Sequence, residues 1–425
     1  MLAQIAEWTY RPFFAYPDKT ERLVYFLVFL FPIAGMSVGG WLSNLFNALV
    51  LIGLLSLWKK REPLLKPEKV FLWICVAYFS MFIIAALGNG WGASQTHELG
   101  TETRFLLVIP LYLLVRRYPD STAWLLRGGI IGGFFLFAQA YSDVIIDGRA
   151  TAWGVYSKNI IGPFAVLSAF WSMYYFWQYK SRSHWLVSIL IVFSVAAAIL
   201  TAGYSGSRGG YVGFIVTGIL CIMFFSKPRW MLVGVAVMSF VGFSLYKDIE
   251  IVRNGVDTAL TETRQYFEAT NHETDASSLT STGTRLEMIR TGILFVMDNP
   301  IIGIGPGNYR KNAEIYIKEG KASPSIAEHS FPHNAFLEVA TAKGLLGLIT
   351  LLLLFYYPVF IYIRDYKVCK PTAVIGLIHI VALSAFSLTD HSVVVMNNYT
   401  SILLLGIAIF FSGHMRACKP HLAYG

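Results

Sequence analysis

The stretch that decides the fold is VFLWICVAYFSMFIIAALG, residues Val70–Gly88, in which no side chain carries a charge. A helix rises about 1.5 Å per residue, so a stretch of this length matches the hydrocarbon layer of a bilayer, roughly 30 Å thick. Comparable apolar stretches recur along the 425 residues, of which 55% are hydrophobic and only 14% charged. This composition excludes an ordinary soluble domain and indicates a polytopic membrane protein.

We therefore predict an all-α polytopic membrane protein with about 12 transmembrane helices. The fourth predicted span is the shortest. The predicted spans are Leu23–Gly39, Trp41–Trp58, Val70–Gly88, Arg104–Val115, Thr122–Ile146, Ile160–Tyr179, Trp185–Leu200, Tyr211–Ser226, Trp230–Tyr246, Gly344–Ile363, Thr372–Leu388 and Thr400–Ser412.

Basic residues gather at both termini and in alternate connections between these spans, which together hold 20 of the 34 Lys and Arg residues. By the positive-inside rule those connections and both termini are cytoplasmic. No basic start or cleavage site marks a signal peptide, so the first span is expected to remain as an anchor. Six cations then fall on or near the short outer connections and are candidates for anion binding: Arg104, Arg149, Lys158, Arg208, Lys247 and Lys343.

One long outer segment, Asp248–His333, interrupts the spans and carries 8 basic and 12 acidic residues. We therefore expect three parts: spans one to nine (1–247), a partly helical periplasmic loop (248–333) and spans ten to twelve (334–425). Within the loop, Ser281–Asn299 has an apolar stripe at helical spacing, Leu286, Ile289, Ile293 and Val296, which predicts a helix on the membrane surface. Thr282 is a candidate cap for it.

The Gly303, Gly305 and Gly307 cluster beyond this helix predicts a turn, with a phosphate cradle as the less favoured interpretation. Asn334 then begins a helix that leads to Lys343. Two cysteines lie in spans, and Cys369 and Cys418 lie on the expected cytoplasmic side, where disulfides are rare. We predict no disulfide and no cysteine metal site.

Two arginines have the surroundings of a diphosphate site. Arg208 lies in a Ser/Gly turn between spans seven and eight, where glycines allow close approach of a ligand. Arg285 lies in the first turn of the loop helix, whose free N–H groups add positive character. The alternatives are that Arg208 extends to lipid headgroups and that Arg285 pairs with Glu287, Glu273 or Asp275. Arg290 is the weaker candidate, better explained as a solvated charge.

His333 precedes the helix that starts at Asn334, and a helix N-terminus favours neutral imidazole. A neutral imidazole can accept a proton from a sugar hydroxyl, although a structural interfacial histidine is the alternative. The remaining histidines, among them His97, His391 and His414, show no metal-ligand spacing, and no acidic pair or nucleophile elbow is present. The sequence therefore favours chemistry without a metal, a cofactor or a covalent intermediate, and nothing in it suggests nucleic-acid binding.

Several motifs together resemble the O-antigen ligase/polymerase superfamily. They are the Arg208 turn before span eight, Thr282-Gly-Thr-Arg285-Leu-Glu-Met288, Asn299-Pro-Ile-Ile-Gly-Ile-Gly-Pro-Gly-Asn308 and Pro332-His333-Asn334-Ala-Phe-Leu-Glu338. The similarity covers nearly the whole chain and is sharpest in its second half. Within the superfamily it is most similar to the O-antigen ligases of Gram-negative inner membranes, which implies a glycosyltransferase of the GT-C-like helical type.

The resemblance implies roles for particular residues. The family's important arginines and histidine match Arg208, Arg285 and His333, which become the expected catalytic residues. Arg149, Asn159 and Asp390 are weaker matches, and Arg104 is weaker again. With the outer cation Lys158, the loop-helix residue Arg290 and the motif residue Asn334, they make up the expected substrate-binding residues.

The resemblance also implies the reaction: inverting transfer of a glycan from undecaprenyl diphosphate to the lipid A-core oligosaccharide at the periplasmic face, among membrane lipids. Polymerisation of the same carrier-linked glycan is the first alternative, since the motifs identify the chemistry better than the acceptor. A lipid-linked glycan transporter is a lesser one, because the unusual charges lie at the outer boundary and not at the midplane. A non-catalytic membrane scaffold is the least favoured.

Overall fold

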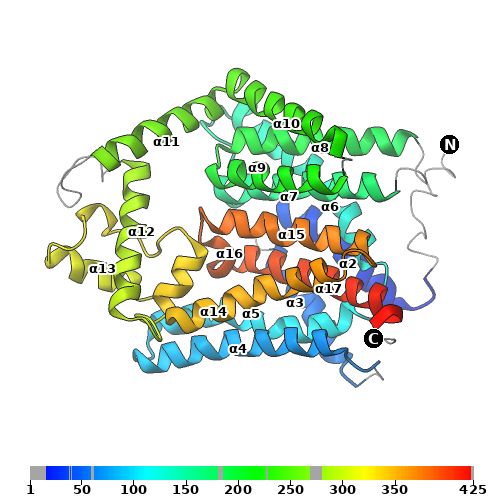
Figure 1. Ribbon diagram of the computed structural model, residues 1–425, viewed down its shortest axis with the longest axis horizontal. Helices are drawn as coiled ribbons and strands as arrows, with labels where there is room; N and C mark the ends of the chain where they lie inside the picture. Colours follow the sequence, from blue (N-terminus) through cyan, green and yellow to red (C-terminus); the bar gives the residue numbers. More distant parts are fainter. Residues whose placement is uncertain are drawn as a thin grey trace.

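The computed structural model describes residues 16–37, 39, 41–58, 62–179, 185–225, 228–268 and 280–422, and within these ranges it is helical with no strand. Long helices run side by side as a bundle, and a group of shorter helices covers one end of it (Figure 1). The predicted all-α polytopic fold is therefore confirmed. Nine described helices have the length and apolar character to cross a membrane.

Each predicted span coincides with a helix. The helices are α2 (Lys19–Ser37), α3 (Trp41–Leu55), α4 (Lys66–Gly88), α5 (Ala93–Val115), α6 (Ser121–Tyr141) with the π-turn η2 (Ser142–Ile146), α7 (Lys158–Tyr179), α8 (Trp185–Ser205), α9 (Arg208–Phe225), α10 (Pro228–Asp248), α14 (Ala335–Arg364), α15 (Lys370–Ser387) and α17 (Asn397–Leu422).

The fourth span is the largest departure from the predicted boundaries. Helix α5 begins at Ala93, eleven residues before the predicted Arg104, and in this polar first half Gln95, Thr101 and Glu102 are buried and hydrogen-bonded. The Gln95 side-chain amide, for example, donates to the backbone carbonyl of Pro306 at 2.6 Å and to Asn308 Oδ1 at 3.3 Å. Hydropathy cannot detect a helix whose polar residues bind to protein instead of water.

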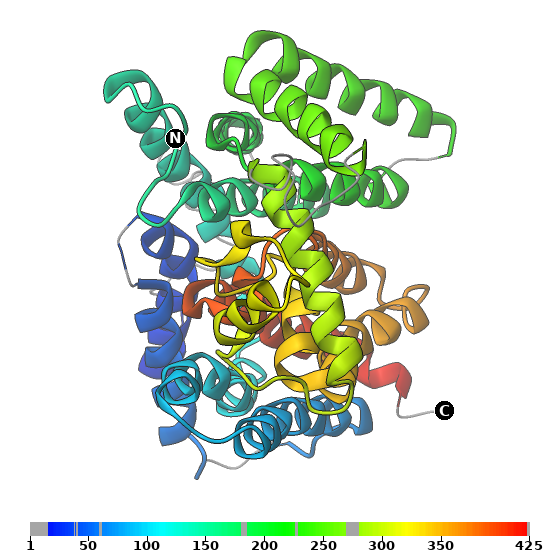
Figure 2. The same ribbon diagram turned by 90° about the vertical axis from the view of Figure 1, so that its left-hand side faces the viewer.

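The helices differ in how deeply they lie in the bundle. Helices α7 and α17 have 83% of their spanning windows buried and α15 has 72%, whereas α10 has none. Figure 2 shows α10 at the edge of the bundle, away from the central α15 and α17. The apolar face of α10 is therefore the one left for lipid.

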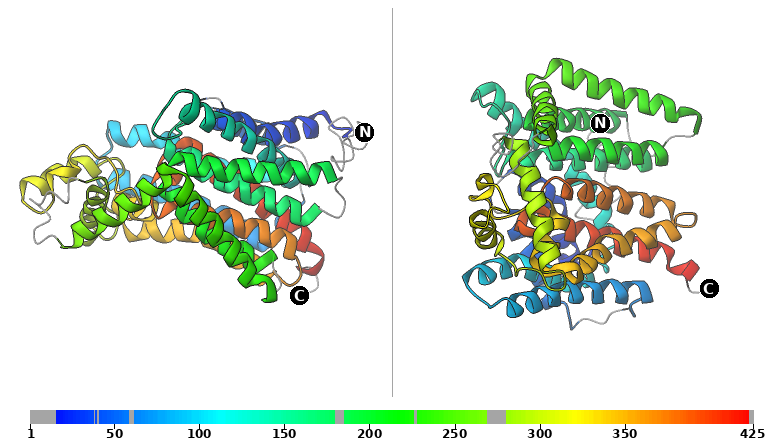
Figure 3. Two further views of the ribbon diagram at one scale, coloured as in Figure 1. Left: turned by 90° about the horizontal axis from the view of Figure 1, so that it is seen from above. Right: turned by 60° about the vertical axis from the view of Figure 1, so that its left-hand side comes forward.

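The long outer segment folds over the end of the bundle opposite to the end of α17 (Figure 3). It comprises α11 (Glu250–Glu268), α12 (Ser281–Asp298), α13 (Tyr309–Lys318) and the short η4 (Pro324–Ile326). Helix α12 crosses the ends of the long helices (Figure 1), in agreement with the expected loop helix. The predicted cap is wrong, since the Thr280 side chain accepts from Gly283 N at 3.0 Å and caps α12 two residues earlier than Thr282.

None of the four residues of the predicted apolar stripe is buried in the protein. Ile293 is 48% exposed, whereas Met288, Thr291 and Phe295 are buried against the loop and α14. The Leu286 and Ile293 side is left free of the protein core, where a membrane surface would meet it.

The glycine cluster after α12 packs against a kink in α14. Gly303 and Gly344 have φ of +68° and +69°, and a side chain at either would collide with the backbone of the other segment. Ile304 N donates to Thr341 O at 2.8 Å and Leu345 N to Pro300 O at 2.7 Å. The predicted turn serves close backbone packing, and the kink at Gly344 lies where the predicted span ten begins.

The prediction of no disulfide is wrong, because Cys369 and Cys418 form one. The sequence argument concerned the compartment and could not show that two residues 49 positions apart meet at the ends of α15 and α17. Cys75 and Cys221 are free and buried in spans, as expected.

Candidate active site

A cavity of about 800 Å³ lies between the bundle end and the loop helices. Its wall combines the segment after η2, the starts of α7 and α9, the α10–α11 junction and the start of α12. Four cations line it, namely Arg149, Lys158, Arg208 and Arg285, with the two carboxylates Asp248 and Glu250. The cavity is therefore large enough for part of a glycan or diphosphate, and its charge favours an anion.

Arg208 reaches from the bundle to the loop helices α11 and α12. It is the first residue of α9, after a turn in which Gly206 has a φ of +64°. Its Nη1 donates to Thr282 Oγ1 at 2.7 Å, and its Nη2 lies 3.8 Å from Glu262 Oε2. Thr282 also donates its hydroxyl to Glu262. This arrangement holds the guanidinium at the cavity and argues against an arginine that extends to lipid headgroups.

Arg285 is a half-buried cation that forms no ion pair among the residues described. Burial, followed by the nearby Arg208 charge, lowers the pKa of its guanidinium, while Asp390 and Glu262 act in the opposite direction. Of its expected partners, Glu287 binds Arg290 instead at 2.7 Å, and Glu273 and Asp275 lie outside the described residues. A half-buried cation with no ion pair among the described residues favours an anionic ligand, which would neutralise it.

Three of the weaker predictions lie at the same cavity. Arg149 forms an ion pair with Asp143 at 3.0 Å, and its side chain remains 52% exposed. Lys158 and Asn159 open α7, and Asn159 Nδ2 donates to Asp390 Oδ2 at 3.2 Å. These residues extend the polar lining from the two arginines toward Asp390.

Asp390 links the cavity to His333. Its carboxylate accepts the backbone N–H of Ser392 at 2.7 Å, and its Oδ2 lies 3.8 Å from His333 Nδ1. Burial raises its pKa, but His333, His391 and the Ser392 hydrogen bonds together lower it to about 2. Asp390 is therefore an anion at neutral pH that can orient a neighbouring imidazole.

His333 has an unusual backbone and a partly open side chain. Its φ is +51°, a left-handed conformation in which histidine is enriched but still uncommon, and 22% of its side chain is exposed. Asn334, the N-cap of α14, accepts from Leu337 N and donates to Leu388 O, each at 3.0 Å. These bonds fix the segment that carries His333, as expected for a residue whose side chain must keep one orientation.

His391 was not predicted as a site residue, although it adjoins Asp390. Its ring lies 4.8 Å from that of His333 and stacks on Phe331 at 4.5 Å. Burial lowers its pKa to about 4, so it is neutral at pH 7. His333, Asp390 and His391 offer ligand atoms within 4.8 Å of one another and could hold a metal ion, a cluster that the search for local spacing missed.

Other predicted residues lie elsewhere. Arg104 is buried inside α5, where it donates to Asn397 at 2.8 Å and Ser401 at 2.9 Å. Arg290 binds Glu287 and Lys321 O. Lys343 lies 2.5 Å from Glu102. None of the three lines the cavity.

Sequence reasoning also missed Glu262, the carboxylate nearest to Arg208. It lies on α11, in the segment predicted only as acidic and partly helical. Its role depends on how α11 docks, which no local pattern in the sequence shows.

Part of the chain matches a known protein family. Residues 193–352 match the family described as O-Antigen ligase, a range that contains Arg208, Arg285 and His333. A Haemophilus influenzae protein described only as uncharacterized is 25% identical over 358 residues, which cover 80% of this chain and 85% of that protein. The matched domain supports the O-antigen ligase/polymerase superfamily that the motifs resemble, whose members are glycosyltransferase-like ligases and polymerases.

Proposed function

We propose that this protein is an O-antigen ligase that transfers a glycan from undecaprenyl diphosphate to the lipid A-core oligosaccharide at the periplasmic face of a Gram-negative inner membrane. The observation that carries the proposal is the pair Arg208 and Arg285 at the wall of one cavity, with Asp390 and His333 directly behind. Planar guanidinium groups suit the oxygens of a diphosphate.

The proposed reaction is an inverting displacement. The acceptor hydroxyl oxygen attacks the anomeric carbon of the donor sugar, and the bond from that carbon to the diphosphate oxygen breaks. Arg208 and Arg285 stabilise the negative charge that develops on the leaving diphosphate. Arg285 has no ion pair to give up among the described residues, so its charge is available to the transition state.

His333 is the proposed general base. It takes the proton of the acceptor hydroxyl as the new glycosidic bond forms. The Asp390 carboxylate on its Nδ1 side favours a proton on that nitrogen and leaves Nε2 to accept one. Neither step needs a metal ion or a cofactor.

The proposed orientation places both termini in the cytoplasm and the cavity in the periplasm. The cavity lies under the loop helices, at the opposite end of the bundle from the end of α17 (Figure 3). A polyprenyl tail would enter between the spans while its diphosphate reaches the arginines. The exposed helix α10 leads to the cavity, because its last residue, Asp248, lines the cavity wall.

The test uses purified full-length protein in liposomes with carrier-linked glycan and either lipid A-core or a second carrier-linked glycan as acceptor. Product mass distinguishes ligation from polymerisation. A product with lipid A-core supports the proposal, whereas chain extension alone replaces it with the polymerase. Movement of the donor across the bilayer without a product would indicate a transporter.

A further inference from the structure

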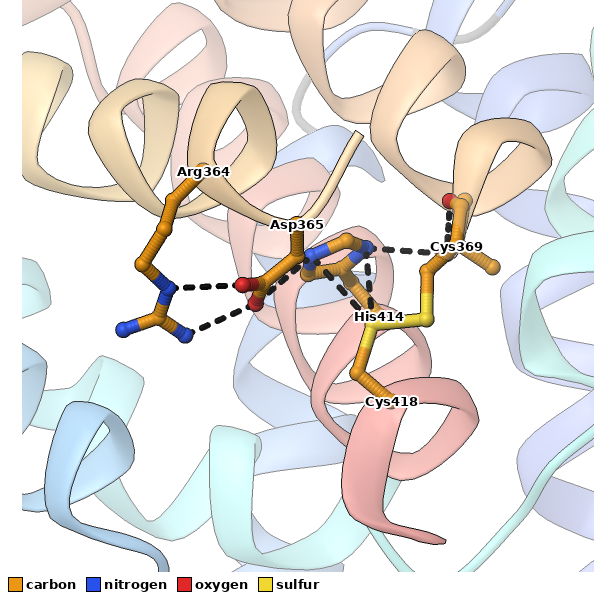
Figure 4. Close-up of a disulfide and its surroundings, with 6 residues drawn as sticks. Arg364, Asp365, Cys369, His414 and Cys418 are labelled. Carbon is orange, nitrogen blue, oxygen red and sulfur yellow. Dashed lines mark hydrogen bonds and ion pairs between the residues drawn. A yellow bond between two sulfur atoms is a disulfide. The ribbon is translucent and has the colours of Figure 1, made fainter. Parts of the chain in front are cut away.

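The structure assigns a transition-metal site, of the zinc class, to four buried side chains at the other end of the bundle. Asp365 ends α14, Cys369 caps α15, and His414 and Cys418 lie one turn apart on α17 (Figure 4). We call these four residues the Cys369 cluster. The two thiols form a disulfide in the structure, and we propose that their reduced form binds Zn²⁺.

The ligand atoms of the cluster lie close enough together for one zinc ion. Bonds of about 2.3 Å to sulfur and about 2.0 to 2.1 Å to nitrogen or oxygen place sulfur and nitrogen about 3.6 Å apart, and nitrogen and oxygen about 3.4 Å apart. Asp365 Oδ2 lies 3.5 Å from His414 Nε2, and Cys418 Sγ lies 3.6 Å from that nitrogen and 3.9 Å from Nδ1. In the disulfide form the sulfur therefore lies beside the ring, and the Cys418 thiolate released by reduction has to turn toward Nε2 to bind the same ion. Asp365, His414 and Cys418 offer ligand atoms within 4.8 Å of one another.

Hydrogen bonds around the cluster prepare His414 as a ligand. Thr372 donates its only hydroxyl proton to Cys369 O at 3.1 Å and lies 2.9 Å from His414 Nδ1. Thr372 Oγ1 can then accept from Nδ1, and the ring tautomer with its proton there leaves the Nε2 lone pair free for a metal ion. Nε2 lies near the Asp365 carboxylate and the Cys418 sulfur, two other ligands of the proposed site.

The carboxylate is held in the same manner. Arg364 donates to Asp365 Oδ1 at 2.6 Å and to Oδ2 at 2.8 Å. These bonds fix the orientation of the carboxylate, and the guanidinium partly balances its negative charge. All four ligand residues are buried, at 8%, 6%, 0% and 1% exposure for Asp365, Cys369, His414 and Cys418. A dry, preorganised site of two sulfurs, one nitrogen and one oxygen suits Zn²⁺ better than Mg²⁺ or Ca²⁺.

Reduction has to precede binding. A cellular dithiol transfers two electrons and two protons to the disulfide, which gives two thiols and the disulfide of the reductant. Zn²⁺ then displaces both thiol protons and binds the two thiolates. The proposed cytoplasmic position of these helix ends supplies such reductants. The bound ion would join the ends of α14, α15 and α17, and this role is independent of glycan transfer.

The experiment uses full-length protein in detergent, treated with dithiothreitol, freed from metal and then given Zn²⁺ or Co²⁺ alone. We expect about one ion per chain and, with Co²⁺, the intense absorption of tetrahedral thiolate coordination. The matched control is the same protein left oxidised, which should bind no ion at this site. Cys75→Ser and Cys221→Ser, remote in the spans, should bind normally.

Variants separate ligation from folding. Cys369→Ser and Cys418→Ser should lose the thiolate absorption, and Thr372→Val should weaken zinc affinity about 10- to 100-fold, because it removes the acceptor for His414. Zinc should also raise the unfolding temperature of the reduced protein in a concentration-dependent way. The inference is overturned if the reduced wild-type protein binds neither ion, or if Cys369→Ser and Cys418→Ser bind as wild type does.

Discussion

Two arginines on the same helix, Arg285 and Arg290, allow the proposed site to be tested against stability. They lie five residues apart on α12, but Arg290 is bound to the buried Glu287 at 2.7 Å and Arg285 forms no ion pair within the described residues. We predict that Arg285→Gln abolishes most transfer without loss of stability. Arg290→Gln should lower the stability and leave most of the transfer activity intact.

The magnitudes follow from these contacts. Removal of one charge that stabilises a leaving group costs about 3 to 4 kcal/mol in the transition state, so Arg285→Gln should lower kcat by about 10² to 10³. Its unfolding temperature should stay equal or rise, because a half-buried cation beside Arg208 is removed and no ion pair is lost. Removal of one partner of a fully buried pair costs about 3 to 5 kcal/mol. The Arg290 side chain is 35% exposed and the Glu287 bonds to Tyr266 and Ser323 remain, so Arg290→Gln should cost less, about 1 to 3 kcal/mol.

The pH dependence of stability gives a second measure of the same pair. Burial raises the pKa of Glu287, but Arg290, Ser323 and Tyr266 together lower it below its usual value. A carboxyl with a depressed folded-state pKa contributes stability above its unfolded pKa, and this contribution is lost as the pH falls through the folded value. In Arg290→Gln the folded pKa rises toward the unfolded value, so the variant should lose less stability on acidification than wild type, and the two stabilities should converge at low pH.

The assay combines thermal unfolding in detergent, over a range of pH, with glycan transfer per folded protein. The reasoning is refuted if Arg285→Gln loses as much stability as Arg290→Gln. It is also refuted if folded Arg290→Gln loses transfer to the same extent as Arg285→Gln.

Three further predictions concern the base, the metal requirement and the loop. Asp390→Asn should lower kcat at least tenfold with little change in donor KM, because His333 loses its orienting carboxylate; unchanged kcat would remove that role. The metal requirement is tested by chelation in a Cys418→Ser background, which lacks the Cys369 cluster, and glycan transfer should be unchanged. Loss of transfer that a divalent ion restores would instead point to His333, Asp390 and His391 as a metal site. Gly344→Ala should destabilise the protein by about 1 to 3 kcal/mol, measured as a lower unfolding temperature, because a φ of +69° and close backbone exclude a side chain; an unchanged value would contradict the packing argument.

The spans could be predicted because hydropathy is a local property of the chain. Every predicted span lies on a helix, and even the boundary before span ten coincides with the kink at Gly344. The prediction failed at the start of α5, whose Gln95 and Thr101 are polar but bound to other segments of the protein.

The site could be predicted only in part. Arg208 and Arg285 were recognisable from glycine-rich and helix-start surroundings, which the structure retains. The disulfide between Cys369 and Cys418 and the cluster around His391 join segments that are distant in the sequence, and no local spacing marks them. Such sites depend on how helix ends meet, which the pattern of single helices does not contain.

The candidate site is built from two parts of the chain, and this explains why neither half of the sequence specifies it alone. The bundle contributes Arg208 and Asp390, while the outer segment contributes Arg285 and His333. The polar contact of Arg208 with Thr282 and Glu262 is one of the bonds that holds the loop over the bundle. A diphosphate would compete with Glu262 for the same guanidinium, since both ligands are anions. Donor binding and loop position are therefore expected to be coupled through Arg208, because a single side chain serves both.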